Sequence, residues 1–408
     1  MTWLRALVVV GAAAAFRAPA RGLRAPRTRA FVARDDDPRA SDAARVAVLC
    51  SVPVVWGTYA PAVKAVYALP APPPGAVFSL FYYVVALGCL GALGRAAAAP
   101  GAAAPDEGAA RAGLELGAYL YAGNLFQVVG LETVSADAAA FLVQLTTVLV
   151  PVLESAATGR AVARETRLAC AVAFSGVAVL CAEGLAADAG QVSGDLCVVA
   201  AAVLYSLHVV RLSALAGAGQ DRECPISAAR RSFRRTRGRA IVSRNGLEAR
   251  ALSRNARARR ARVEAASHRA PPAQALAPSA SALGLATAKA GWEAAFALGG
   301  VAFLALATPF EGGRRFLEAS RTPEEAAALG AAVLWCGAAT CAYTIWAQSF
   351  GQRGVAPSRA NLIYTSQPVF SALFAFGLLG ERPTAATVAG GGLILAAVAT
   401  ELNRDVER

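Results

Sequence analysis

Apolar runs of about twenty residues, separated by short polar turns, follow one another from about residue 45 to residue 402. About twenty residues of helix are enough to cross the hydrocarbon core of a bilayer. We therefore predict ten transmembrane helices, near 45–67, 75–94, 113–130, 134–157, 168–186, 192–212, 288–309, 326–348, 357–379 and 384–402. The pattern predicts an all-α integral membrane protein.

The composition supports this class. Of the 408 residues, 56% are hydrophobic and only 16% are charged, whereas a soluble globular chain carries about 25% charged residues. Too few polar residues remain to cover a soluble surface. The composition excludes a soluble enzyme, a disulfide scaffold and a disordered chain.

The net charge of +13 is concentrated in two segments. Residues 1–34 contain seven Arg and no acid, and residues 220–270 contain fifteen Arg against four acids, so the rest of the chain is net negative. Because the basic character belongs to these segments alone, we expect no nucleic-acid partner. Outside them, thirteen of the eighteen Lys and Arg fall on one side of the ten-span topology, which is the bias of the positive-inside rule.

The first 39 residues have the pattern of a cleavable presequence. Arg5 precedes an apolar run of about ten residues, which is too short to span a bilayer and is typical of a signal peptide. Phe16 then opens a basic segment without acids. This arrangement resembles the two-part plastid presequence of algae with secondary plastids, and a plastid membrane is the expected location. A plain secretory signal with a basic tail is the alternative.

An Arg-rich segment, residues 217–282, lies between the sixth and seventh predicted spans. It has almost no apolar pattern and cannot bury enough surface to fold alone. Three interpretations remain open: a disordered regulatory insert, a patch for anionic lipid or RNA, and an unremoved intron in a GC-rich coding sequence.

The two halves of the membrane region are similar to each other. When Gly130 is set against Gly351, the fourth span aligns with the ninth without a gap, and Gly159 coincides with Gly380. Each repeat then has five spans, residues 45–186 in the first, and residues 192–212 with 285–402 in the second. Because five is odd, the second repeat must be inverted in the membrane, which is a plan found in transporters.

Short motifs in both halves resemble the drug/metabolite transporter superfamily, and specifically paired EamA domains. The first span carries Trp56-Gly57 followed by Lys64, similar to the family's opening motif, and the ninth span ends in Gly380-Glu381-Arg382. In the first half, Arg160 stands where the family has the Glu of that closing motif. The resemblance implies two inverted five-helix repeats that move small organic solutes by alternating access. Some relatives exchange phosphorylated sugars or nucleotide sugars, and others export amino acids and related metabolites.

Polar residues inside the predicted spans are the candidates for contact with a solute, because such residues are costly in a membrane. Several share a helical face, such as Asn124 with Gln127 and Asn361 with Tyr364. The cavity candidates are Trp56, Asn124, Gln127, Gln144, His208, Asn361, Tyr364 and Gln367. Hydrogen bonds between helices are an equally open role for the amides.

A second group of candidates concerns charge and helix geometry. Lys64, Glu154, Arg211 and Arg359 are candidates for substrate charge or ion coupling. Lys64 and Arg211 lie near span ends, where reaching the membrane interface is the alternative role. Pro151 and Pro368 are candidate helix breaks, which are tolerated where they line a cavity, and simple kinks are the alternative.

The residues favour a transporter of a neutral or zwitterionic metabolite. A phosphate-linked exchanger is the alternative, because Lys64, Arg211, Lys289 and Arg359 alone could pair with phosphate, all near span ends. An integral-membrane enzyme and a non-transporting scaffold are alternatives of another class. Eight Cys without a C-x-x-C pair and two His predict no metal and no cofactor. The expected partners are a small molecule and the lipid bilayer, and a homodimer stays open.

Overall fold

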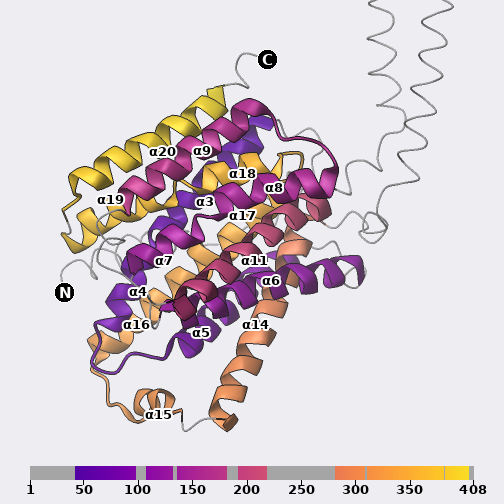
Figure 1. Ribbon diagram of the computed structural model, residues 1–408. Helices are drawn as coiled ribbons and strands as arrows, with labels where there is room; N and C mark the ends of the chain where they lie inside the picture. Colours follow the sequence, from indigo (N-terminus) through magenta and orange to yellow (C-terminus); the bar gives the residue numbers. More distant parts are fainter. Residues whose placement is uncertain are drawn as a thin grey trace, which may run out of the picture.

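The computed structural model describes residues 42–97, 107–131, 136–181, 192–217, 281–307, 310–380 and 382–403. These residues form a bundle of helices joined by turns, with no strand among them (Figure 1). The predicted presequence, nearly all of the Arg-rich segment and Glu381 lie outside the described residues. The all-α fold class is therefore confirmed.

The helices of the first half are α3 (Asp42–Gly57), α4 (Tyr59–Tyr67), α5 (Gly75–Ala97), α6 (Glu107–Leu131), α7 (Ala136–Val143), α8 (Thr146–Thr158) and α9 (Arg164–Leu180). Those of the second half are α11 (Val192–Gly217), α14 (Ala282–Ala307), α15 (Glu311–Glu318), α16 (Pro323–Trp335), the π-helix η2 (Cys336–Tyr343), α17 (Thr344–Gly351), α18 (Pro357–Tyr364), α19 (Gln367–Leu379) and α20 (Ala385–Asn403).

Within the described residues, seven helices are long and apolar enough to cross a bilayer. They correspond to the predicted spans one, two, four, six, seven, eight and ten. The other three spans are also helical, but α6 carries Glu107, Arg111 and Glu115, α9 has 17 residues, and the ninth span is divided into α18 and α19. Membrane-spanning helices are confirmed, while the count of ten stays a prediction.

The fourth and ninth spans are interrupted at corresponding points. The interruptions fall at Gln144–Leu145 and at Thr365–Ser366, where the chain makes tight turns, such as Leu145 N–H to Leu142 O and Ser366 N–H to Ile363 O, both 3.1 Å. The two positions are 221 residues apart, as are Gly159 and Gly380. Both of these glycines end their helix with a positive φ, 64° and 72°, a conformation that residues with a side chain rarely adopt.

Pro151 is not a helix break, which corrects the prediction for this residue. Helix α8 continues through Pro151 to Thr158, and the interruption lies earlier, at Gln144–Leu145. Proline removes only one intrahelical hydrogen bond, the one to the carbonyl of Thr147, and the remaining bonds keep α8 continuous. Pro368 does lie at an interruption, because it occupies the first turn of α19, where its missing N–H costs nothing.

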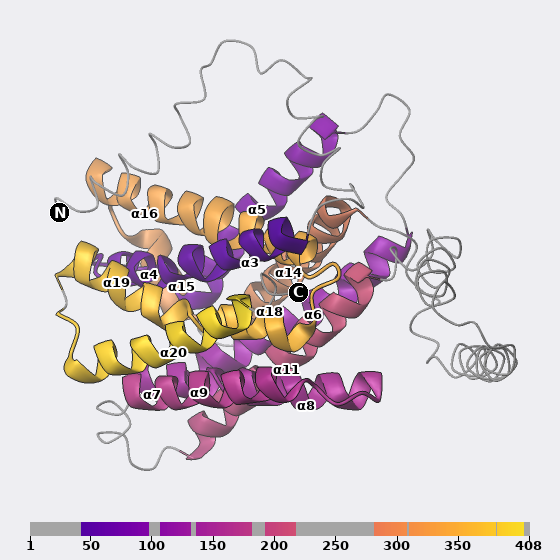
Figure 2. The same ribbon diagram turned by 90° about the horizontal axis from the view of Figure 1, so that it is seen from above.

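Small residues bring pairs of helices into close contact, as is common in membrane bundles. Helices α9 and α20 lie side by side (Figure 2), and a Cβ added at Gly176 would come within 2.7 Å of the Gly390 carbonyl oxygen. Helices α6 and α14 meet at Gly113, where an added Cβ would lie 2.7 Å from the backbone of Ala288. The second contact fixes the position of α14.

The eighth span contains a π-helical segment that the sequence pattern does not predict. Its eight residues, η2, join α16 to α17 without a turn. The hydroxyl of Thr340 in this segment donates to the carbonyl of Cys336 at 2.8 Å. Segments of this kind occur frequently at functional sites.

Candidate functional site

A cavity of about 570 Å³ lies inside the bundle. Its wall contains residues from α3 to α8, from α11 and α14, and from η2 to α19. Helices of both halves therefore enclose it. Among the described helices, α9, α15, α16 and α20 contribute no residue to the wall.

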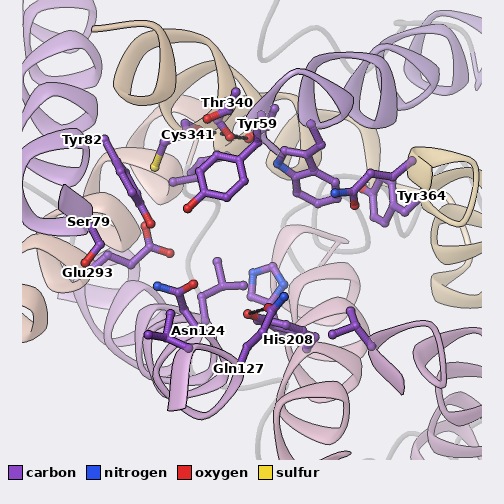
Figure 3. Close-up of a pocket in the computed structure, with 18 of the residues that line it drawn as sticks. Tyr59, Ser79, Tyr82, Asn124, Gln127, His208, Glu293, Thr340, Cys341 and Tyr364 are labelled. Carbon is purple, nitrogen blue, oxygen red and sulfur yellow. Dashed lines mark hydrogen bonds between the residues drawn. The ribbon is translucent and has the colours of Figure 1, made fainter. Parts of the chain in front are cut away.

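All eight cavity candidates named from the sequence line this cavity: Trp56, Asn124, Gln127, Gln144, His208, Asn361, Tyr364 and Gln367. Some of them also connect helices. The hydroxyl of Tyr205 donates to Gln127 Oε1 at 2.8 Å, and Gln352 Nε2 donates to the Tyr364 hydroxyl at 2.9 Å. Figure 3 shows Asn124, Gln127 and His208 on one side of the cavity, and Tyr364 with Tyr59 across from them.

The interrupted spans meet at this cavity. Gln144 and Thr146 line it from the fourth span, and Asn361, Tyr364 and Gln367 line it from the ninth. Beside it, the hydroxyls of Thr147 and Thr365 are hydrogen-bonded at 2.8 Å, so the two interruptions are joined directly. Irregular backbone at membrane depth is tolerated where it lines a cavity or is buried in protein, and both conditions are met here.

Aromatic side chains form much of the wall. Eight of the lining residues are aromatic: Trp56, Tyr59, Tyr67, Phe78, Tyr82, Tyr83, Tyr205 and Tyr364. The rings of Trp56 and Tyr364 meet edge to face with centroids 5.4 Å apart, and those of Tyr59 and Tyr82 do so at 6.2 Å. Such pairs hold the rings in fixed orientations. The wall is therefore apolar and aromatic, with a few polar groups at defined places.

Two buried polar side chains in the wall have groups without a hydrogen-bond partner in the described part of the chain. Both carboxylate oxygens of Glu293 are unpaired, and so is the amide nitrogen of Asn361. Glu293 is 1% exposed and Asn361 is 4% exposed. Buried polar groups are nearly always satisfied in proteins, so these two are positioned to bind a ligand.

Lys289 lies one helical turn before Glu293 on α14 and is fully buried. Its ammonium nitrogen is 2.9 Å from Nε2 of His208, which lines the cavity. Lys289 itself does not line the cavity, and neither does any other Lys or Arg of the described residues. The carboxylate of Glu293 is the acid that faces the interior.

The four charge candidates lie away from the cavity wall. Lys64 is exposed on α4, and Arg359 is half-buried on α18. Arg211 forms a two-pronged ion pair with Glu115 of α6. The carboxylate of Glu154 accepts hydrogen bonds from the backbone N–H and the hydroxyl of Ser358, at 2.8 Å for the N–H, and so caps the N-terminus of α18.

Sequence reasoning missed Glu293 and misplaced Lys289 near a span end. The signal was present, since two ionisable residues four apart inside one apolar span share a helical face. The wall residues Tyr59, Tyr82, Thr340 and Cys341 were also missed. For the last two no signal existed, because a helix of ordinary period does not predict the π-helical segment that presents them.

Comparison with family models finds a similarity within the second half of the chain. Residues 287–400 match the model of the EamA-like transporter family. No curated protein matches the sequence significantly. Twenty-two chains of solved structures match the fold. One of them, titled "Crystal structure of protein", has a TM-score of 0.58 and 16% identity and covers 90% of this chain and 100% of its own. Identity this low shows a shared fold alone.

Proposed function

We propose that this membrane protein, whose residues 287–400 match the model of the EamA-like transporter family, moves a small organic metabolite across a membrane by alternating access. The substrate binds in the central cavity, and the two halves of the chain move against each other to open the cavity to one side at a time. Inverted halves around a midplane site provide such a motion in other transporters.

One observation carries this proposal. Helices of both halves enclose the same cavity, and both interrupted spans line it. A cavity of about 570 Å³ has the size of small-molecule sites, which are typically 300–1,000 Å³. A solute held between the halves contacts both of them. Their relative motion therefore changes its access to either side.

The wall favours a solute without phosphate. Phosphate recognition usually uses Arg or Lys as charge-assisted donors, and the described wall contains neither. Lys289 is buried one helical turn before the wall residue Glu293, and its ammonium nitrogen lies 2.9 Å from Nε2 of His208. The phosphate-linked exchanger thus has less support than a carrier of neutral, zwitterionic or cationic solutes.

The test is flux through the purified chain in proteoliposomes. Candidate solutes are first selected by thermal stabilisation, since a ligand at 100 times its Kd stabilises by about 2.7 kcal/mol.

We expect Gln144→Leu and Asn361→Leu to lower the flux of a selected solute at least tenfold while the protein still folds. Thr400→Leu is the matched control, because Thr400 is exposed on the outer face of α20. Unchanged flux in both cavity variants would contradict the cavity assignment, and a chain that carries no solute would favour a scaffold or an enzyme.

The plastid membrane is the proposed location, and it rests on residues 1–39 of the sequence. A fluorescent reporter fused behind residues 1–39 should accumulate in the plastids of an alga with secondary plastids. The matched control replaces Phe16 by Ala, because the Phe after the cleavage site is the specific element of the resemblance. Secretion of both reporters would support the plain signal peptide instead.

A further inference from the structure

Glu293 is the one acid in the described wall of the cavity. From its surroundings we infer that it binds the ammonium group of the transported solute, so that the substrates are organic ammonium compounds. This inference rests on the proposed function and narrows its substrate class. The ammonium group occupies the space in front of the carboxylate, and the organic part of the solute lies against the aromatic wall.

Helix packing holds the backbone that carries Glu293. Helix α14 is held against α6 by the close contact at Gly113, and Glu293 lies one turn beyond that contact. In Figure 3 its carboxylate points into the cavity beside Ser79, Tyr82 and Asn124. It is close enough to Lys289, Tyr83 and Tyr205 to interact electrostatically with each. No described group donates a hydrogen bond to either oxygen.

A buried carboxylate without donors is unfavourable, because burial removes its hydration shell. Lys289 offsets part of this cost from one turn away, but its nitrogen makes its contact with His208, at 2.9 Å. The described wall contains no Arg or Lys that could take the place in front of Glu293. A cationic group of the solute supplies the missing partner directly.

The residues around the carboxylate favour an organic cation over a metal ion. Phe78, Tyr82 and Tyr83 pack together, with ring centroids of successive pairs 5.6 Å and 4.6 Å apart. Aromatic faces attract ammonium groups, including quaternary ones. Hard metal ions instead require about six oxygen ligands, and the described residues contain no group of three or more His, Cys, Asp or Glu that could hold a metal ion.

The inference also predicts how Lys289 affects ammonium binding, and this effect is opposite to that of Glu293. Its positive charge repels a bound ammonium group, while Glu293 attracts it. Removal of the charge at 289 should therefore strengthen ammonium binding, and removal of the charge at 293 should weaken it. A merely structural role of the Lys289–Glu293 pair would make both substitutions harmful.

The experiment compares probes of one shape with and without the charge. 2-Phenylethylamine is paired with 2-phenylethanol, and choline with its uncharged carbon analogue 3,3-dimethylbutanol. Phenylalanine, which adds a carboxylate to the same skeleton, distinguishes amines from amino acids as the source of the ammonium group. Binding to the full chain in detergent is measured by calorimetry, and flux is measured in proteoliposomes.

We expect at least one charged probe to bind at least tenfold more tightly than its neutral partner. Glu293→Gln, which keeps the shape of the side chain, should weaken that probe at least tenfold, or about 1.4 kcal/mol. Lys289→Gln, which keeps a donor for His208, should strengthen it several-fold. Glu401→Gln is the matched control, since Glu401 is a buried acid that bonds Thr166 away from the cavity.

Three outcomes would overturn the inference: equal binding of charged and neutral probes, an unchanged affinity in a folded Glu293→Gln protein, and no binding of any charged probe. Failure of the transport proposal has a different signature. In that case no solute is carried by the unsubstituted chain, whereas a failed Glu293 assignment leaves a flux that depends on Gln144 and Asn361 and is insensitive to Glu293→Gln.

Discussion

Arg211 and Glu115 form a two-pronged ion pair between α11 and α6, with distances of 2.5 Å from Nε to Oε1 and 2.8 Å from Nη2 to Oε2. Both side chains are about 30% exposed, 29% and 31%. This geometry predicts a structural role for Arg211. Arg211→Gln should lower the free energy of unfolding by about 1 kcal/mol, because the partly exposed Glu115 carboxylate loses its partner. Thermal melting in detergent measures the loss.

The double variant Arg211→Gln with Glu115→Gln provides the control for this prediction. It removes both charges, so its stability should return toward that of the unsubstituted protein. A measurement of ion-coupled flux distinguishes the alternative, in which Arg211 couples transport to an ion. If Arg211→Gln leaves the melting temperature unchanged and abolishes coupled transport, Arg211 is a coupling residue as the sequence allowed.

The sequence could identify polar residues inside apolar spans but not the direction in which they point. Asn124 with Gln127, and Asn361 with Tyr364, share a face by their spacing alone, and the structure places all four at one cavity. Arg211 and Glu154 satisfy the same criterion but bond to neighbouring helices. Spacing determines which residues share a face, while the packing of other helices decides what that face meets.

At the scale of single helices, the run Gly390–Gly392 of α20 provides a test within three residues. A Cβ at Gly390 would lie 2.6 Å from the Leu180 backbone nitrogen of α9, whereas a Cβ at Gly392 would meet nothing within 4 Å. Gly390→Val should therefore separate α9 from α20 and destabilise the protein by about 1–3 kcal/mol. Gly392→Val is the matched control and should be close to neutral. Equal melting temperatures for the two variants would contradict the observed packing of α20 on α9.

The helix interruptions could be predicted only in part. The alignment of Gly130 with Gly351 gives the spacing that the interruptions at Gln144 and Thr365 also show, so the correspondence of the two spans was accessible from the sequence. The exact position was not accessible in the fourth span, because its proline lies in the interior of α8. A hydrogen bond between Thr147 and Thr365 joins the two interruptions. Because this hydrogen bond joins residues 218 positions apart, no local sequence pattern predicts it.

At the scale of the whole molecule, hydrogen bonds join the helix ends that the charge bias assigns to one side of the membrane. Arg45 bonds to the carbonyl of Arg353, and Thr166 bonds to Glu401. At the other end of the bundle, Arg321 donates to the carbonyl of Ala71 at 3.2 Å. Composition and hydropathy were sufficient for the fold class. The cavity was beyond them, because it arises from the crossing of helices from both halves.

The topology can be tested by inserting a short protease site into the turn at residues 160–163, between α8 and α9, and another at residues 319–321, between α15 and α16. Three predicted spans separate these turns, so the two sites should be cut from opposite sides of a sealed vesicle.

A site fused after Arg408 is the control and should be cut together with the first, because Glu401 of α20 bonds to Thr166 near the start of α9. The structure agrees with this, since α15 and the last turn of α20 lie at opposite ends of the bundle (Figure 1). Cleavage of both internal sites from one side would require an even number of crossings between them. One of α9, α11 and α14 would then fail to span the bilayer, and the inverted arrangement of the two halves on which alternating access depends would be lost.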